Sequence, residues 1–327
     1  MSPMREPEEQ AGRYLEHLLA TRPPRAKSLV VTVFGDSILP HGGAVWVGSL
    51  IRLLGPFGIN ERGVRTAVRR LTVEGWLGNR SVGRRSDYAP TPGSRLRFEA
   101  ADRRIYAAAA PPWDGTWCLV LLDRAGLSTS ERDNARRELR WQGFGEISPK
   151  LLLHPAADPG ALRSALDDLG LTGRAIVFEG AAGLGFGSGP SSGGGALREL
   201  VRMAWQLDDL ALEYQDFLDR FDPLDRMPEG CLLHDPETCF GLRTLAIHEY
   251  RRILLRDPQL PEELLPECWE GTAARRLCAR LYRRLEARAA EHLLATCETS
   301  SGRLPPLSRS YRHRFDGIGE ASLRRAG

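Results

Sequence analysis

The 327-residue sequence predicts an α+β protein in three parts: a winged helix-turn-helix, a ferredoxin-like βαββαβ domain and an all-helical C-terminal domain. Three observations carry this prediction. Residues 59–76 form a helical pattern with one apolar and one arginine-rich face, followed by two strand-like runs. Residues 117–180 change to apolar runs and helical stretches in the order βαββαβ. Beyond residue 196, apolar residues recur at three- and four-residue steps, which indicates helices.

The N-terminal segment, residues 1–26, is polar and punctuated by proline, so we expect disorder with one short amphipathic helix. The predicted winged-helix domain spans residues 27–110 and opens with two helices. The first covers residues 28–38 and the second residues 44–55, each with apolar residues at helical spacing. A glycine- and proline-rich turn at residues 55–58 leads to a third helix, as in a tri-helical helix-turn-helix.

The third helix carries clear signals at both ends in the stretch INERGVRTAVRRLTVEGW. Asn60 is a suitable N-cap, and Gly75 suits the left-handed position that ends many helices. Val64, Val68 and Leu71 share one face, and the opposite face is basic. Such a helix packs on one side and enters the major groove with the other. The candidate DNA-binding residues of this helix are Arg62, Arg65, Thr66, Arg69 and Arg70.

The positive charge of the chain is concentrated around this helix. Between Ile59 and Arg97, nine arginines accompany three carboxylates, which gives a net charge of +6. Since the whole chain carries +3, the remainder carries −3. Arginine is abundant throughout the chain, and an arginine-rich helix face is often only solvated. The local concentration nevertheless favours nucleic-acid binding.

The stretch WLGNRSVGRRSDYAPT predicts a β-wing, because it reads as two short strands joined at residues 83–85 and ended by Pro90. The tip of this hairpin is doubly basic. Arg84 and Arg85 are therefore candidates for phosphate contacts, although an exposed hairpin tip without a partner is the simpler interpretation of an isolated hairpin. The residues that follow, 94–107, have a helical pattern.

The predicted ferredoxin-like domain spans residues 111–180. Its strands are expected at residues 117–123, 144–147, 150–154 and 174–180, and its helices at residues 130–141 and 159–169. Ser130 and Asp133 resemble a capping box at the start of the first helix. Residues 181–195 are rich in glycine and serine and are expected to form a linker. No G-x-G-x-x-G spacing occurs there, so the segment is not a dinucleotide-binding loop.

The predicted C-terminal domain, residues 196–298, contains three amphipathic helices at about residues 197–221, 238–255 and 272–296. The tail from residue 299 to residue 327 is rich in arginine, serine and proline, and we expect it to be disordered.

Composition excludes several functional classes. No apolar run is long enough to span a bilayer, and the acidic N-terminus does not resemble a signal peptide, so we expect a cytoplasmic protein. The six cysteines form no C-x-x-C pair, and we expect reduced thiols and no metal site. Only Lys27 and Lys150 are lysines, and neither lies in a Walker A motif or a pattern typical of pyridoxal binding. We therefore expect no cofactor and no enzymatic activity.

Several stretches of this sequence resemble the PaaX-type repressors of bacterial phenylacetic-acid degradation operons. The resemblance is carried by residues 28–77, GRRSDYAPTPGS, RRIYAAAAPPWDGTWCLVLLD and HEYRRILLRDPQLPEELLPECWEG. It implies that the central domain is similar to Cas2. It also implies a homodimer that binds double-stranded operator DNA, represses a catabolic operon and is released by an aryl-CoA thioester such as phenylacetyl-CoA. A dimer agrees with the half-site spacing that two-fold symmetric DNA-binding proteins recognise.

A CoA thioester carries three phosphoryl groups, so its pocket needs arginine donors and an aromatic surface. One segment of the C-terminal part offers both. The candidate effector-binding residues are His248, Tyr250, Arg251, Arg252 and Arg256. An equally good interpretation is a helix whose arginines pair with Glu249, Asp257 and Glu262.

Two other functions remain open. Cas2-like nucleases bind a metal through an aspartate at the end of the first strand, where this sequence has Asp123. A single carboxylate rarely holds a catalytic metal, so a turn-capping role for Asp123 is the favoured interpretation. A winged-helix scaffold that binds proteins instead of DNA is disfavoured by the local charge of +6.

Overall fold

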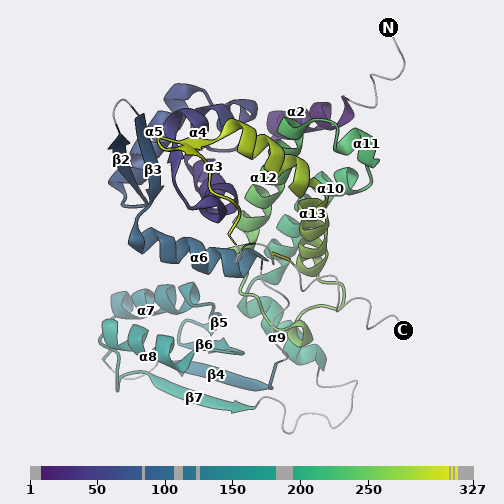
Figure 1. The fold of residues 1–327 in the computed structure, drawn as a ribbon. Coiled ribbons are helices and arrows are strands. Elements are labelled where there is room, and N and C mark those ends of the chain that lie inside the picture. The colour runs from purple at the N-terminus through teal and green to yellow at the C-terminus, as the bar shows by residue number, and fades with distance from the viewer. Residues whose placement is uncertain are drawn as a thin grey trace. The chain divides into compact units, whose positions relative to one another are not determined.

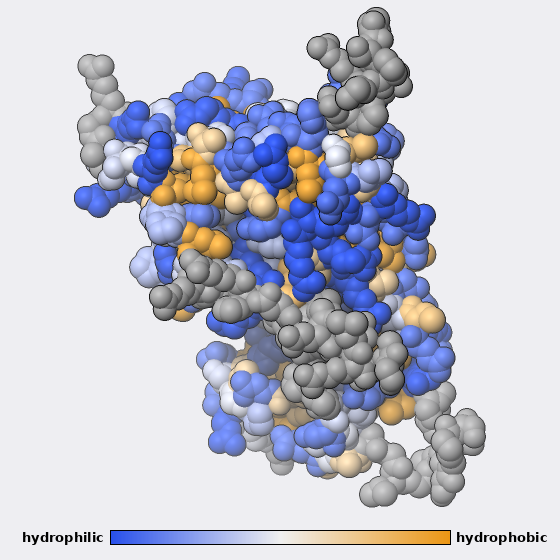
Figure 2. Space-filling view, turned by 45° about the vertical axis from the view of Figure 1, so that its right-hand side comes forward, coloured by the Kyte–Doolittle hydropathy of each residue, from blue (hydrophilic) through white to orange (hydrophobic). Residues whose placement is uncertain are grey.

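The computed structural model describes residues 9–82, 85–106, 113–122, 126–181, 194–308, 311 and 314–315. The chain forms two units. Unit 1 contains Met1–Ala109, Tyr214–Leu255 and Gly271–Gly327, and unit 2 contains Ala110–Glu213 and Arg256–Glu270. None of the helices described is long and apolar enough to cross a membrane. Most of the surface in Figure 2 is hydrophilic, and its hydrophobic residues lie in separate patches.

Unit 1 begins with α2 (Gln10–Thr21) and continues into the predicted tri-helical core (Figure 1). Helix α3 (Ala26–Val33) runs on through a π-helical turn, η1 (Phe34–Ile38), and a short 3₁₀ turn, η2 (Leu39–His41). Helix α4 (Val47–Leu54) leads through η3 (Gly55–Phe57) to α5 (Glu61–Val73). Both α3 and α4 pack against α5.

The wing follows α5 as an antiparallel hairpin of β2 (Leu77–Val82) and β3 (Arg85–Pro90). A third strand, β1 (Val45–Trp46), pairs with the other edge of β3 and completes a sheet of order β1-β3-β2. The sequence analysis missed β1, because two residues that precede a helix carry no alternation of their own. Helix α6 (Pro92–Tyr106) follows the wing and is the last element of this N-terminal part of unit 1.

The remaining helices of unit 1 surround α12 (Pro236–Leu254), in which every residue from Cys239 to Tyr250 is buried. Their bounds are Leu207–Asp225 for α10, whose residues from Tyr214 onward belong to this unit, Glu229–Leu232 for α11 and Glu270–Thr296 for α13. Helix α12 packs against α2, α3, α6 and η3. Helices α12 and α13, which lie in the predicted C-terminal domain, are grouped with the winged helix in unit 1.

The tail after Thr299, expected to be disordered, is ordered over the residues described. Strands β8 (Glu298–Thr299) and β9 (Gly302–Arg303) form a small hairpin, and further along Arg314 and Phe315 are buried. An arginine-rich composition is typical of disorder, but Arg314 finds buried acceptors in Asp36 and Asp102. The expectation was therefore wrong for this part of the tail.

Unit 2 confirms the predicted βαββαβ order. Its elements are β4 (Thr116–Leu121), α7 (Thr129–Trp141), β5 (Gly145–Ser148), β6 (Leu151–His154), α8 (Pro159–Asp168) and β7 (Ile176–Ala181). The strands form an antiparallel sheet of order β5-β6-β4-β7. Figure 1 shows α7 and α8 on one face of this sheet, where Val120, Leu139 and Leu162 contribute to the core.

Two local expectations in unit 2 need correction. The capping box of α7 is formed by Ser128 and Glu131, not by Ser130 and Asp133, because the helix begins at Thr129. The predicted continuous helix after residue 197 is interrupted: α9 (Gly194–Ala204) ends before Gln206, whose φ is 52°, and α10 follows. At this break the indole of Trp205 donates a hydrogen bond of 2.8 Å to the carbonyl oxygen of Gly143.

One further turn, η4 (Glu262–Leu264), lies in the segment that links α12 to α13.

Candidate nucleic-acid interface

Helix α5 is fixed at both ends by the residues that the sequence indicates. The side-chain oxygen of Asn60 accepts a hydrogen bond of 2.9 Å from the backbone N–H of Gly63, which makes Asn60 the N-cap. Gly75 has a φ of 74°, and the N–H of Trp76 donates to the carbonyl of Leu71 at 2.8 Å. This 6→1 bond is the mark of a Schellman ending. Helix α5 therefore has well-defined ends.

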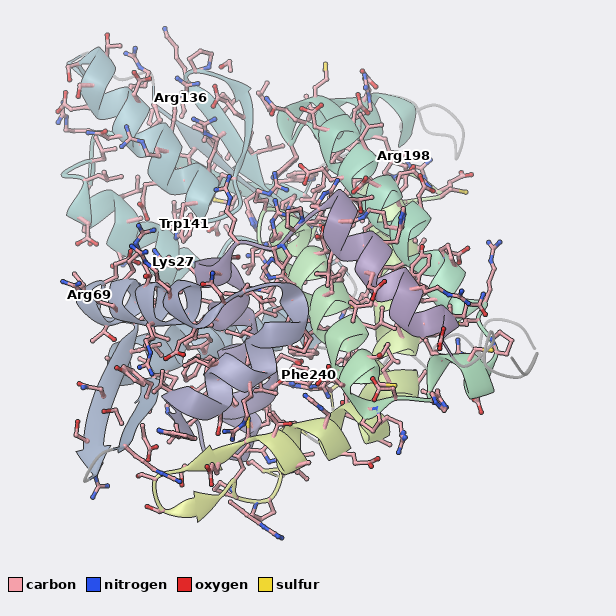
Figure 3. All side chains as sticks on the ribbon, turned by 90° about the horizontal axis from the view of Figure 1, so that it is seen from above. Lys27, Arg69, Arg136, Trp141, Arg198 and Phe240 are labelled. Atoms are coloured by element: carbon pink, nitrogen blue, oxygen red, sulfur yellow. The ribbon has the colours of Figure 1, made fainter. Side chains whose placement is uncertain are left out.

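The two faces of α5 separate as predicted. Val64, Val68 and Leu71 are at most 1% exposed, and Ala67 lies with them. The polar face is open: the five candidate residues are all exposed, and Figure 3 shows Arg69 at the periphery, in contrast to Phe240 among the helices. A shallow hollow follows this face and is lined by Glu61, Arg62, Arg65, Thr66 and Arg69.

The arginines of this face have few competing partners. Arg65 pairs with Glu61 one turn earlier, with 2.8 Å between Nε and Oε1, and both side chains are more than half exposed. An exposed pair of this kind contributes little stability, so a phosphate can replace the carboxylate. Within the described part of the chain, Arg62, Arg69 and Arg70 make no ion pair.

Of the two candidate residues on the wing, the structure describes only Arg85. Arg84 lies outside the described residues, so its placement stays a prediction. The guanidinium of Arg85 lies 4.6 Å from the ring centroid of Trp46, and its Nη1 is 3.4 Å from Oε1 of Glu298. Arg85 therefore stabilises the wing through these two contacts within the chain. The sequence analysis overlooked Arg80, an exposed arginine on β2. Its position on a strand of the basic wing is the feature that could have identified it as a candidate for DNA binding.

The start of the tail is attached to the wing. Asp87 on β3 accepts hydrogen bonds from the backbone N–H of Ser300 at 2.8 Å and from its hydroxyl at 2.5 Å. The carboxylate of Glu298 pairs with Arg85, and its Oε1 also lies 3.9 Å from Nη2 of Arg52 on α4. These contacts link the end of α13 to the wing within unit 1.

A buried ionic cluster holds the winged helix to α12 and to the tail. Asp36 on η1 pairs with Arg243 of α12 at 3.0 Å and with Arg314 at 3.3 Å, and all three side chains are at most 4% exposed. The hydroxyl of Tyr106 donates a hydrogen bond of 2.6 Å to Asp36. Burial alone would raise the pKa of Asp36, but Arg243 and Arg314 hold it below its usual value. The carboxylate therefore stays ionised.

The five candidate effector residues are not assembled into one open site. His248 and Tyr250 are 2% and 1% exposed and belong to the core. The ring nitrogen Nδ1 of His248 lies 2.8 Å from the hydroxyl of Thr32, to which Arg251 also donates at 2.8 Å. Burial, assisted by Arg251 and Arg252, lowers the pKa of His248 to about 3. These contacts join α12 to α3.

The other two candidates lie elsewhere. Arg252 is exposed on α12, and Arg256 belongs to unit 2, where it pairs with Glu213. The expected partner Glu249 pairs instead with Arg22 and Arg220, at 3.2 and 2.9 Å.

Asp123 lies outside the described residues, so the nuclease hypothesis is not tested at that position. Among the described residues, no group of three or more histidine, cysteine or acidic side chains is placed to hold a metal ion.

Comparison with known proteins agrees with the three-part organisation. Residues 25–91 match the PaaX-like protein family, residues 110–191 the PaaX protein central Cas2-like domain, and residues 205–295 the PaaX-like protein C-terminal domain. The chain is 37% identical over 306 residues to transcriptional repressor PaaX of Escherichia coli strain K12, covering 93% of this chain and 94% of that protein. An uncharacterized protein from Mycobacterium tuberculosis has a similar fold, with a TM-score of 0.52 and 22% identity over 80% of this chain and 98% of its own.

Proposed function

The chain belongs to the PaaX-like protein family, and we propose that it is a transcriptional repressor that binds operator DNA through α5 and the wing. The observation that carries the proposal is the separation of faces on α5. Its apolar side is buried against α3 and α4, and its arginine side is exposed. A helix held in this way presents guanidinium groups to phosphates and base edges without having to unfold.

The DNA-contacting residues we propose are Arg62, Arg65, Thr66, Arg69 and Arg70 on α5, with Arg84, Arg85 and Arg80 on the wing. Arg62, Arg69 and Arg70 are the clearest of them, because they are exposed and have no ion-pair partner among the described residues. Guanidinium groups on a recognition helix donate paired hydrogen bonds to guanine or bind phosphate oxygens.

We further propose that the repressor binds as a homodimer. Each chain supplies one α5, and a helix-turn-helix protein that recognises a palindrome needs two such helices about 34 Å apart, one turn of DNA. The exposed arginine face of α5 is the surface that a second copy would duplicate.

The effector we propose is an aryl-CoA thioester, as the resemblance to phenylacetic-acid repressors implies. Release of DNA requires that this ligand bind the DNA-incompetent arrangement more tightly than the DNA-bound one. A shift from mostly bound to mostly released requires a difference of a few kcal/mol between the two affinities.

Operator binding by an Arg69→Ala variant tests the proposal. DNA from upstream of the gene and of its neighbours is titrated with the purified protein, and anisotropy reports the affinity. We expect affinity to fall about 5- to 150-fold for a base-contacting arginine, since such a contact contributes about 1–3 kcal/mol. Arg226→Ala is the matched control, because Arg226 is an 80% exposed arginine of unit 1 that pairs with Asp222 of α10. Equal affinity of the Arg69 and Arg226 variants would contradict the proposal.

A further inference from the structure

Unit 2 contains a pocket of about 390 Å³ at one end of its sheet. Its walls come from the loop before β4, the ends of β4, β6 and β7, and residues 258–261. The apolar part includes Trp113, Pro155 and Leu260, and apolar atoms form most of the surface. This volume lies within the range of small-molecule sites, which are mostly apolar with a few convergent polar groups.

The polar part of the pocket includes a row of three residues across the sheet. Cys118 on β4 lies directly opposite His154 on β6 and Glu179 on β7. Residues opposite one another in antiparallel strands point to the same face. Cys118 belongs to the core on the face that α7 and α8 cover, so the row lies on that face, and all three residues line the pocket.

The thiol and the imidazole of this row are uncharged at neutral pH. Burial, reinforced by Glu179, raises the pKa of Cys118 to about 11, and burial lowers the pKa of His154 to about 4. Nδ1 of His154 accepts a hydrogen bond of 2.9 Å from the N–H of Ala156, which places the ring proton on Nε2. A protonated thiol is a poor nucleophile, so a thioester in contact with Cys118 would remain intact. Cys118, His154 and Glu179 are therefore suited to binding a ligand and not to transferring its acyl group.

One wall of the pocket is a rigid aromatic surface. The indole N–H of Trp113 donates to the carbonyl oxygens of Pro155 at 2.7 Å and Thr116 at 3.0 Å. The ring of Trp113 meets Trp117 edge-on, with 5.3 Å between centroids. An aromatic wall fixed before binding costs little entropy when a ligand packs on it.

The charge of the lining defines which part of a ligand fits. Asp114 and Glu179 are acidic, and no lysine or arginine is among the described residues that line the pocket. Phosphate and carboxylate groups are therefore repelled, while an uncharged apolar or aromatic group meets Trp113, Leu260 and the neighbouring prolines.

We propose that this pocket holds the acyl group of the thioester effector and leaves the phosphate-bearing part of the ligand outside. The inference rests on the proposed function and assigns the effector's uncharged end to a site. This pocket also takes the place of His248 and Tyr250 on α12 as the candidate effector site, because those two side chains are buried.

The pocket is connected to the DNA-binding unit through the chain itself. Residues 258–261 belong to the segment that joins the end of α12 at Leu254 to the start of α13 at Glu270. Gln259 has a φ of 55°, and its N–H is held by Asp257 at 2.6 Å, so this stretch has a specific backbone conformation. A ligand in the pocket therefore contacts a segment that follows α12 closely in the chain, and α12 packs against α3 and α6 of the winged helix.

The test compares phenylacetyl-CoA with coenzyme A by calorimetry on the full chain. Ala156→Phe places a ring in the pocket at an exposed position that keeps its backbone N–H for His154. The matched control is Ala161→Phe, the same substitution at an exposed position of α8 that does not line the pocket. In the wild type, the acyl group is expected to improve affinity over coenzyme A by about tenfold or more.

We expect Ala156→Phe to abolish this acyl-dependent gain while leaving coenzyme A binding and operator binding unchanged. The Ala161→Phe variant should behave as the wild type. If Ala156→Phe retains the full preference for phenylacetyl-CoA, the pocket assignment is overturned and the proposed repressor function stands. If the wild type binds operator DNA but shows no preference for phenylacetyl-CoA over coenzyme A, the aryl-CoA effector and this pocket assignment are both overturned, and DNA binding stands alone.

Discussion

Arginine serves two different purposes on two helices of unit 1. On α5, Arg62, Arg65 and Arg69 are exposed, and only Arg65 has an ion-pair partner among the described residues. On α12, Arg243 is 3% exposed and is held between Asp36 and Glu286. Helix α5 has a strict apolar stripe, so its arginines project outward. Most of α12 is buried, so Arg243 in its middle needs internal partners. Arginine content alone therefore does not identify a binding surface, and burial is what separates the exposed arginines of α5 from Arg243.

The largest contrast concerns stability. Asp36→Ala removes the buried carboxylate and leaves Arg243 and Arg314 without their common partner. We expect a loss of about 3–5 kcal/mol in the free energy of unfolding, because breaking a buried ion pair leaves uncompensated charge. Arg69→Ala on α5 should change it by no more than about 0.5 kcal/mol. Urea denaturation of both variants measures the difference, and equal losses would show that the Asp36 cluster is not structural.

A second prediction concerns pH and His248. Its pKa in the folded state is about 3, below the ordinary value of 6.5, so the unfolded chain binds more protons between these values. The resulting stability is complete above pH 6.5 and is lost as pH falls toward 3, by up to about 1.4 kcal/mol per pH unit. His248→Asn should lose less stability than the wild type between pH 7 and pH 5. Parallel curves for the two proteins would mean that His248 does not titrate in this way.

The smallest predicted effect concerns the exposed pair on α5. Glu61→Gln removes the carboxylate that pairs with Arg65, and with it one negative charge from the face of α5 that we propose binds DNA. We expect operator affinity to rise by a few fold, since exposed pairs contribute about 0.2–1 kcal/mol. Anisotropy titrations at low salt measure the gain, with Asp222→Gln on α10 as the control for loss of a distant carboxylate. Weaker binding by Glu61→Gln would indicate that the carboxylate positions Arg65 for the operator.

The sequence predicted features that depend on neighbouring residues. The caps of α5, its two faces and the βαββαβ order follow from short-range patterns, and all are present in the structure. The Asp36 cluster did not follow, because its partners Arg243 and Arg314 are 207 and 278 residues away in the chain. His248 looked like a ligand-binding residue for a related reason: it is buried and contacts Thr32 of α3, which lies 216 residues away in the chain.

The α5 interface is tested most directly by the salt dependence of operator binding. The slope of log affinity against log salt is measured for the wild type and for a variant with Arg62, Arg65 and Arg69 all changed to alanine. Removing one phosphate-binding arginine should reduce the slope by about 0.9, so the triple variant is expected to show a clearly shallower slope and much weaker binding. The same slope and the same affinity in both proteins would contradict the assignment of α5 as the DNA-binding helix.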